Sequence, residues 1–211
     1  AIVFRERLAV LLSYDGEPRY EDIENSDYQR VINAPIAVVR NKRGQHFVTN
    51  GRLWYQATSA MGPWVSTTAP PPDLVKAMPA PDSDLPDWDT PPEIVVATRP
   101  TELIVTDGAP QWKPLEGGQV LYVTNTESPW LRDLPTGNMY LLLSGRWFRA
   151  KSTSGPWTFV PADELPTAFA DIPPASDIGG LRTSVAGTPE AQEAVLDAQI
   201  PQTAAISRDA T

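Results

Sequence analysis

Large aromatic side chains stand beside polar and basic ones at two places in the chain. Residues 51–64 read GRLWYQATSAMGPW and residues 145–157 read GRWFRAKSTSGPW. A tryptophan ring offers a flat apolar surface that can lie against the C–H face of a sugar, while neighbouring polar side chains hydrogen-bond the hydroxyls. If the protein binds a ligand, the candidate residues are therefore Trp54, Trp64, Trp147, Trp157, Gln56, Arg149 and Lys151.

Two other roles compete with sugar binding for these rings: they can cover a small hydrophobic core or form a protein–protein contact. Neighbouring residues of a strand point to opposite faces. In each segment the strand tryptophan thus shares a face with a polar residue, Gln56 or Arg149, and the aromatic residue after it shares the other face with an alanine. We expect the alanine face to be core, which places Trp54 and Trp147 at the surface or in a groove.

The residues typical of enzyme active sites are missing. The chain has no cysteine and a single histidine, His46, in the strand-like run QHFVTN, where a histidine is usually structural. There is no glycine-rich phosphate loop and no metal-ligand spacing. A pair of carboxylates could serve a glycosidase, but Asp15 and Asp107 are turn residues on separate copies, and the acids at 82–89 lie in a proline-rich spacer. We predict a non-enzymatic protein with no metal and no cofactor.

The charge balance argues against nucleic acid as a partner. The formal net charge is −9, and nucleic-acid binders normally present a basic patch. The one basic cluster, 40–43, is predicted to be a solvated hairpin tip. No apolar run approaches the ~20 residues that span a bilayer.

The chain repeats itself. At an offset of 92 residues, Ile2-Val3-Phe4 falls on Ile94-Val95-Val96 and Asp15-Gly16 falls on Asp107-Gly108. After small gaps the match returns at an offset of 93, and Gly62-Pro63-Trp64 falls on Gly155-Pro156-Trp157. Because identities fall at turn residues and apolar positions together, the sequence predicts two copies of one module.

Within each copy the segments are short and β-like, and Asp-Gly, Asn-Gly and similar pairs separate them, which predicts tight hairpins. We predict an all-β fold of two tandem antiparallel meanders with five to seven strands each, leaving open a small barrel, a compact sandwich or an expanded propeller blade. The predicted domains are a first repeat at 1–69, an acidic proline-rich linker at 70–93, a second repeat at 94–176, and a linker at 177–211. That last linker carries a helix at 188–200, capped by Thr188, and the start of a third repeat.

The stretch LSGRWFRAKSTSGPWTFVPADELPTAFADIPP resembles a family of bacterial repeat proteins labelled "carbohydrate-binding family V/XII". The likeness covers 101–208 closely and 8–79 as a more divergent copy. It implies a secreted protein of the cell envelope, periplasmic or extracellular, with further repeats. We therefore expect a scaffold or protein-interaction unit whose partners are further repeats of a longer parent chain or other envelope proteins. The alternative is a carbohydrate-binding module that holds polysaccharide on exposed tryptophans.

Overall fold

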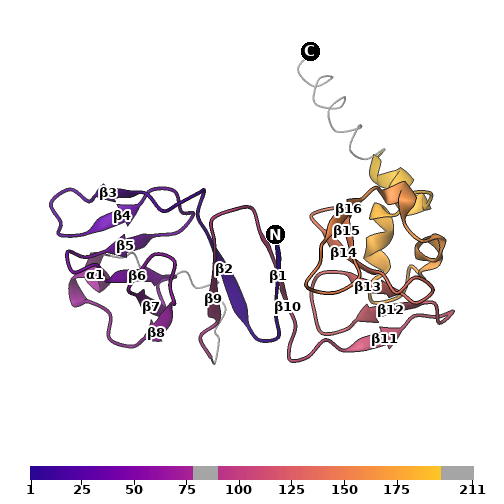
Figure 1. Cartoon of the computed structure of the whole chain (residues 1–211), viewed down its shortest axis with the longest axis horizontal. Coiled ribbons are helices and arrows are strands. Elements are labelled where there is room, and N and C mark those ends of the chain that lie inside the picture. The colour runs from indigo at the N-terminus through magenta and orange to yellow at the C-terminus, as the bar shows by residue number, and fades with distance from the viewer. Residues whose placement is uncertain (78–89, 196–211) are drawn as a thin grey trace, which may run out of the picture. The chain divides into compact units, whose positions relative to one another are not determined.

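The structure is a computed structural model that describes residues 1–77 and 90–195. The chain divides into two compact units, Ala1–Val105 and Thr106–Thr211. Each unit contains a six-stranded antiparallel sheet whose strands follow one another in sequence order (Figure 1). The predicted all-β fold with two tandem antiparallel meanders is confirmed at this level.

The two sheets use strands of three to five residues joined by tight turns. The first sheet contains β3 (Tyr20–Asp22), β4 (Gln29–Val31), β5 (Val38–Arg40), β6 (His46–Thr49), β7 (Trp54–Ala57) and β8 (Val65–Thr67). The second sheet contains β11 (Trp112–Pro114), β12 (Val120–Val123), β13 (Trp130–Asp133), β14 (Met139–Leu143), β15 (Arg146–Ala150) and β16 (Thr158–Val160).

The registers of the two sheets correspond strand by strand. Tyr20 pairs with Val31 in the first sheet, and the residues 92 positions later, Trp112 and Val123, pair in the second. From β6 and β14 onward the offset is 93, as in the pairs His46–Ala57 and Met139–Ala150. The change falls in one hairpin, since Val38 pairs with Val48 whereas Trp130 pairs with Leu141. The predicted repeat is therefore a repeat of backbone pairing.

Four further strands form two parallel pairs within the first unit. They are β1 (Ile2–Arg5) with β10 (Glu102–Val105), and β2 (Ala9–Ser13) with β9 (Glu93–Ala97). The expected hairpin at Asp15-Gly16 is wrong, because β2 pairs with β9 instead of with the strand that follows it. The Asp-Gly turn links β2 to the meander, and Asn33 holds it by donating its amide to the carbonyls of Asp15 and Glu17. Asn125 makes the matching contacts in the second copy.

Each unit has one main core. In the first unit, one face of the sheet packs on β2 and β9 through buried and half-buried residues that include Val38, Val48, Leu12 and Ile94. In the second unit, the core lies under a covering segment of three 3₁₀ turns, namely η1 (Ala162–Glu164), η2 (Thr167–Asp171) and η3 (Gly179–Ser184).

Short helices follow both meanders. At the start of the predicted linker lies a short helix, α1 (Pro72–Ala77), with Leu74 buried; residues 78–89 of that linker lie outside the described residues. The predicted C-terminal helix is present at 189–195, and the backbone N–H of Ala191 donates to the Thr188 hydroxyl, which confirms the cap. Residues 196–200 of that helix, and the proposed start of a third repeat, lie outside the described residues.

Candidate functional site

The expectation that Trp147 lies at the surface is wrong. Its side chain is only 1% exposed and belongs to the core of the second unit. The indole N–H donates to the carbonyl of Ser184 in η3 at 2.8 Å, and Phe169 of η2 packs near the ring. Periodicity along β15 could not reveal this, because the cover comes from residues that follow the sheet.

Trp54 occupies the corresponding place in the first unit and is half-buried, whereas Gln56 on the same face is exposed. A row of side chains runs across this face, because Arg30, Val39, Phe47, Gln56 and Val65 are successive cross-strand partners from β4 to β8. We call these five residues together with Trp54 the open face.

The open face is less deeply buried than the equivalent face of the second sheet. On the second sheet the equivalent residues Tyr122, Leu131, Tyr140 and Trp147 are all buried in the core. On the open face only Phe47 of the four equivalents is buried, Arg30 is exposed, and Val65 is 59% exposed.

A shallow hollow lies along one side of the open face. Its volume is about 350 Å³, and its lining is mainly apolar, with two amide side chains contributed by Gln45 and Gln56. Pro63 and Val65 complete most of its wall. Of the seven predicted site residues, only Gln56 lines it.

The remaining predicted residues do not form one site. Trp64 and Trp157 are half-buried, each beside the glycine of its Gly-Pro turn. A β-carbon on Gly155 would lie 2.9 Å from the Trp157 nitrogen and 3.2 Å from the ring, so the turn needs glycine there. Arg149 is exposed, and Lys151 donates to the carbonyl of Thr136 at 3.0 Å, which gives this lysine a structural role.

The two Gly-Pro turns differ in which side chain donates a hydrogen bond to the equivalent carbonyl. Trp157 Nε1 donates to the carbonyl of Thr153 at 3.1 Å. The equivalent carbonyl in the first unit, that of Ala60, accepts from the buried Tyr14 hydroxyl at 2.7 Å, and Trp64 Nε1 is buried without a partner. The second copy has Thr106 in place of Tyr14. The Thr153 carbonyl is therefore left to accept from the Trp157 indole.

The parallel pairing of strands between the copies is the feature that sequence reasoning missed. Partners are 100 positions apart in the β1–β10 pair and 84 apart in the β2–β9 pair, and the mean of the two, 92, is the repeat offset. If each residue is replaced by its equivalent in the other copy, the β1–β10 pair becomes the β2–β9 pair in the same register. The N–H of Glu93 donates to Leu8 at 3.0 Å, and its counterpart, the amino group of Ala1, donates to Pro100 at 3.0 Å.

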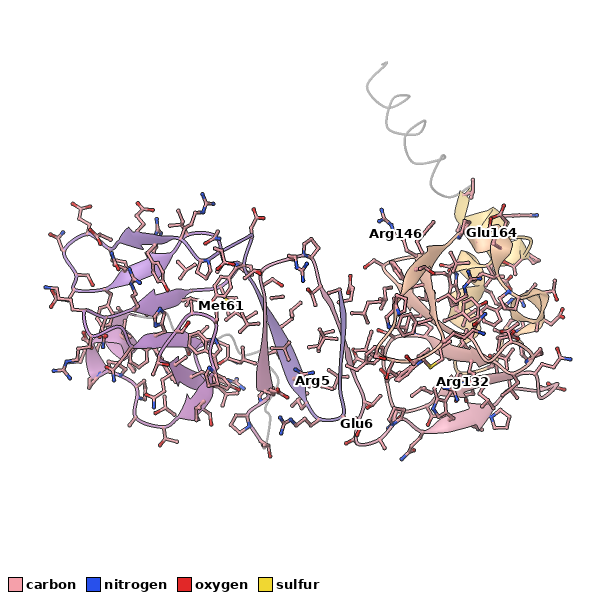
Figure 2. The ribbon with its side chains drawn as sticks, viewed as in Figure 1. Arg5, Glu6, Met61, Arg132, Arg146 and Glu164 are labelled. Atoms are coloured by element: carbon pink, nitrogen blue, oxygen red, sulfur yellow. The ribbon has the colours of Figure 1, made fainter. Side chains whose placement is uncertain are left out.

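An ion cluster holds this arrangement on one side. The Glu93 carboxylate of β9 lies 3.3 Å from Arg5 Nε and 2.9 Å from Arg7 Nε, and Arg5 is labelled on β1 in Figure 2. Mainly through Arg7, but also through Arg5, these hydrogen bonds hold the pKa of Glu93 below its usual range. The cluster joins a residue of the second copy to two of the first.

A second repeated contact lies on the other face of each sheet. In the first unit this is the face opposite the open face. The Arg40 guanidinium stacks 3.5 Å from the Tyr20 ring centre, and Arg132 (Figure 2) stacks 4.8 Å from the Trp112 ring centre. Buried His46 donates from Nδ1 to the Gly44 carbonyl, which leaves Nε2 to accept from the Tyr20 hydroxyl at 2.7 Å. Burial, together with the Arg40 charge, lowers the pKa of His46.

Within the described residues, no cluster of three or more His, Cys, Asp or Glu side chains is arranged to hold a metal ion. None of the helices at 1–77 or 90–195 combines the length and apolar character that crossing a membrane requires.

Comparison with known proteins adds no relative, since no protein-family model, no curated protein and no solved structure matches the chain.

Proposed function

We propose that the chain is a non-enzymatic assembly module of a secreted bacterial cell-envelope protein, and that its copies associate in pairs through strands that each copy contributes. The reciprocal pairing of β1 with β10 and of β2 with β9 is the observation that carries this proposal. Two copies in one chain that pair through equivalent strands behave as a covalently linked dimer.

The first core also depends on the second copy. Ile94 and Val96 of β9 pack against the core of the first unit, and Val95 between them is buried. A module that takes a strand from its neighbour leaves apolar surface and unpaired backbone groups exposed when alone, which favours association of modules over their independence.

Of the three forms that the sequence left open, we propose the compact sandwich. The β2–β9 pair forms a second β layer over one face of the first sheet, because residues of both layers share a single core.

Cutting the chain between the copies tests the proposal. A protease site placed within residues 78–89 separates the two copies covalently without touching a paired strand. We expect the two pieces to elute together from a gel-filtration column, since β1, β2, β9 and β10 hold them. In a matched variant that also carries Ile94→Asp, the charge placed in the first core should release the pieces. Pieces that separate after cutting without that substitution would refute paired association.

The alternative function is carbohydrate binding. Of the two strand tryptophans expected to hold polysaccharide, only Trp54 is partly exposed. Trp54 is half-buried and lies two residues from Gln56, which lines the hollow, whereas Trp147 has no free ring face. Retention of the chain on insoluble polysaccharide that is lost in Trp54→Ala and kept in Arg149→Ala would favour this alternative.

A further inference from the structure

The contacts that pair the two copies act across space and not along the chain. Paired residues are 100 positions apart between β1 and β10 and 84 positions apart between β2 and β9. Backbone hydrogen bonds, apolar side chains and an ion cluster hold these strands together. None of these contacts requires that both strands belong to one chain, so the pairing surface of a first copy also fits the second copy of another chain.

The first core takes its closing strand from a second copy. Ile94 and Val96 of β9 pack on this core, and Val96 lies opposite Leu12 of β2, which is only 1% exposed. β10 gives the same surface a second attachment, because Ile104, also 1% exposed, lies opposite Phe4 of β1. A second copy therefore brings two strands to a first copy, whichever chain it comes from.

The ion cluster favours unlike copies as partners. The Glu93 carboxylate of the second copy lies 3.3 Å from Arg5 Nε and 2.9 Å from Arg7 Nε of the first. The equivalent of Glu93 in the first copy is Ala1. Two first copies that met in the same register would place Ala1 where Glu93 lies, and their arginines would face no carboxylate there. The charges therefore favour a second copy as the partner of a first copy.

We propose that the module joins two chains, in that the first copy of one chain pairs with the second copy of the other through β1, β2, β9 and β10. This inference rests on the proposed function and adds the partner, which is a second copy of this chain. Two chains that exchange their second copies in both directions form a closed pair with two-fold symmetry. The covalent link gives pairing within one chain an effective concentration of about 1 mM, so pairing between chains becomes competitive where modules are packed near that concentration.

Two complementary variants of the full chain test the exchange. The acceptor variant carries Val96→Asp and Ile104→Asp, and the donor variant carries the equivalent changes Phe4→Asp and Leu12→Asp. Each pair of charges should break pairing within its own chain. The acceptor keeps unaltered β1 and β2, and the donor keeps unaltered β9 and β10. We expect a one-to-one complex on mixing, measured by sedimentation velocity, with self-association of either variant severalfold weaker.

An isotope-labelled acceptor reports whether the complex restores the first core. Val38 and Val48 are buried there, so the NMR signals of their methyl groups depend on that packing. In the labelled acceptor alone these signals should lose their native positions. Addition of the unlabelled donor should return them to the positions that they have in the unaltered chain.

A charge exchange between the two chains tests the contact itself. Arg7→Glu in the acceptor should weaken the complex severalfold at low salt and less at high salt, because it presents a like charge to Glu93 of the donor. Glu93→Arg in the donor should then recover part of this loss, since the two changes rebuild an ion pair. The matched control is Arg99→Glu in the donor, at the position equivalent to Arg7. It should not weaken the complex, because Ala1 has no carboxylate to repel the new charge.

Three results would overturn the proposal. The first is no complex up to about 1 mM of each variant, the concentration at which pairing between chains rivals pairing within one. The second is a complex that leaves the Val38 and Val48 signals unrestored, which would be aggregation of exposed surface. The third is a complex that Arg7→Glu and Arg99→Glu weaken equally.

The cut-chain experiment separates failure of this inference from failure of the proposed function. If the cut pieces stay together but the acceptor and the donor do not associate, the copies pair within one chain and pairing between chains is refuted. Native Val38 and Val48 signals in the acceptor alone would show that the first core needs no strand from a second copy, which would refute both.

Discussion

Truncating the two equivalent tryptophans should have unequal consequences. Trp147 is 1% exposed, and an indole of this kind buries roughly 150–250 Å². At about 25 cal/mol per Å² that is about 4–6 kcal/mol, and the residual compactness of the unfolded chain reduces it by roughly 10–40%. Trp147→Ala should therefore lower the free energy of unfolding of the second unit by about 3–5 kcal/mol, within the usual range for a buried aromatic residue. Trp54 is less deeply buried, so Trp54→Ala removes less buried apolar area and should cost less.

Urea unfolding followed by circular dichroism, with the m-value checked for each variant, measures both costs. Trp147→Phe is the control, because it keeps most of the apolar area but leaves the Ser184 carbonyl without its donor, and we expect it to cost about 1–2 kcal/mol. Equal costs for the two alanine variants, or a cost under about 1 kcal/mol for Trp147→Ala, would contradict the covering of the second sheet by η2 and η3.

Three smaller predictions follow from single contacts. Gly179→Ala should strongly destabilise the covering segment in thermal unfolding, since a β-carbon there would lie 2.1 Å from the Pro174 carbonyl oxygen; Gly180→Ala, with open space around it, should not. Glu93→Gln should cost about 0.5–1 kcal/mol at neutral pH and low salt and less at high salt, because its arginine partners are partly exposed; unfolding curves in urea measure the difference. The lowered pKa of His46 means that the unfolded chain takes up a proton first as the pH falls, so unfolding free energy should drop as the pH goes below about 6.5, and His46→Gln should flatten that part of the pH profile.

The features that could be predicted from sequence are those set by neighbouring residues. Turn residues and alternating apolar positions located both meanders, and Thr188 before Pro189 marked the start of a helix. The Asn33–Asn125 match at the same offset of 92 was also present in the sequence, but only the structure shows that both asparagines bond the carbonyls of the Asp-Gly segments.

The features that could not be predicted depend on residues far apart in the chain. The face that carries Trp147 is core because Ser184 and its neighbours, 37 positions later, fold over it. β2 pairs with β9 at a separation of 84 residues, and neither strand carries a local signal that names its partner. Period-two alternation assigns the two faces of a strand but not which face is covered, so the same pattern could not distinguish half-buried Trp54 from fully buried Trp147.

The two sheet faces have different roles in the paired module. The face that carries Val38 and Val48 must match β2 and β9, and changing it in one copy disturbs a core that both copies build. The opposite face takes no part in pairing, so each copy can use it separately. In the second copy, Tyr122, Leu131 and Trp147 are closed off by the chain's own cover, whereas the first copy keeps the tryptophan but replaces Tyr122 with Arg30. An arginine at that position is costly to bury unless a carboxylate pairs with it. Pairing through one face therefore leaves the other face to each copy's own contacts, and the two copies differ in how far they bury it.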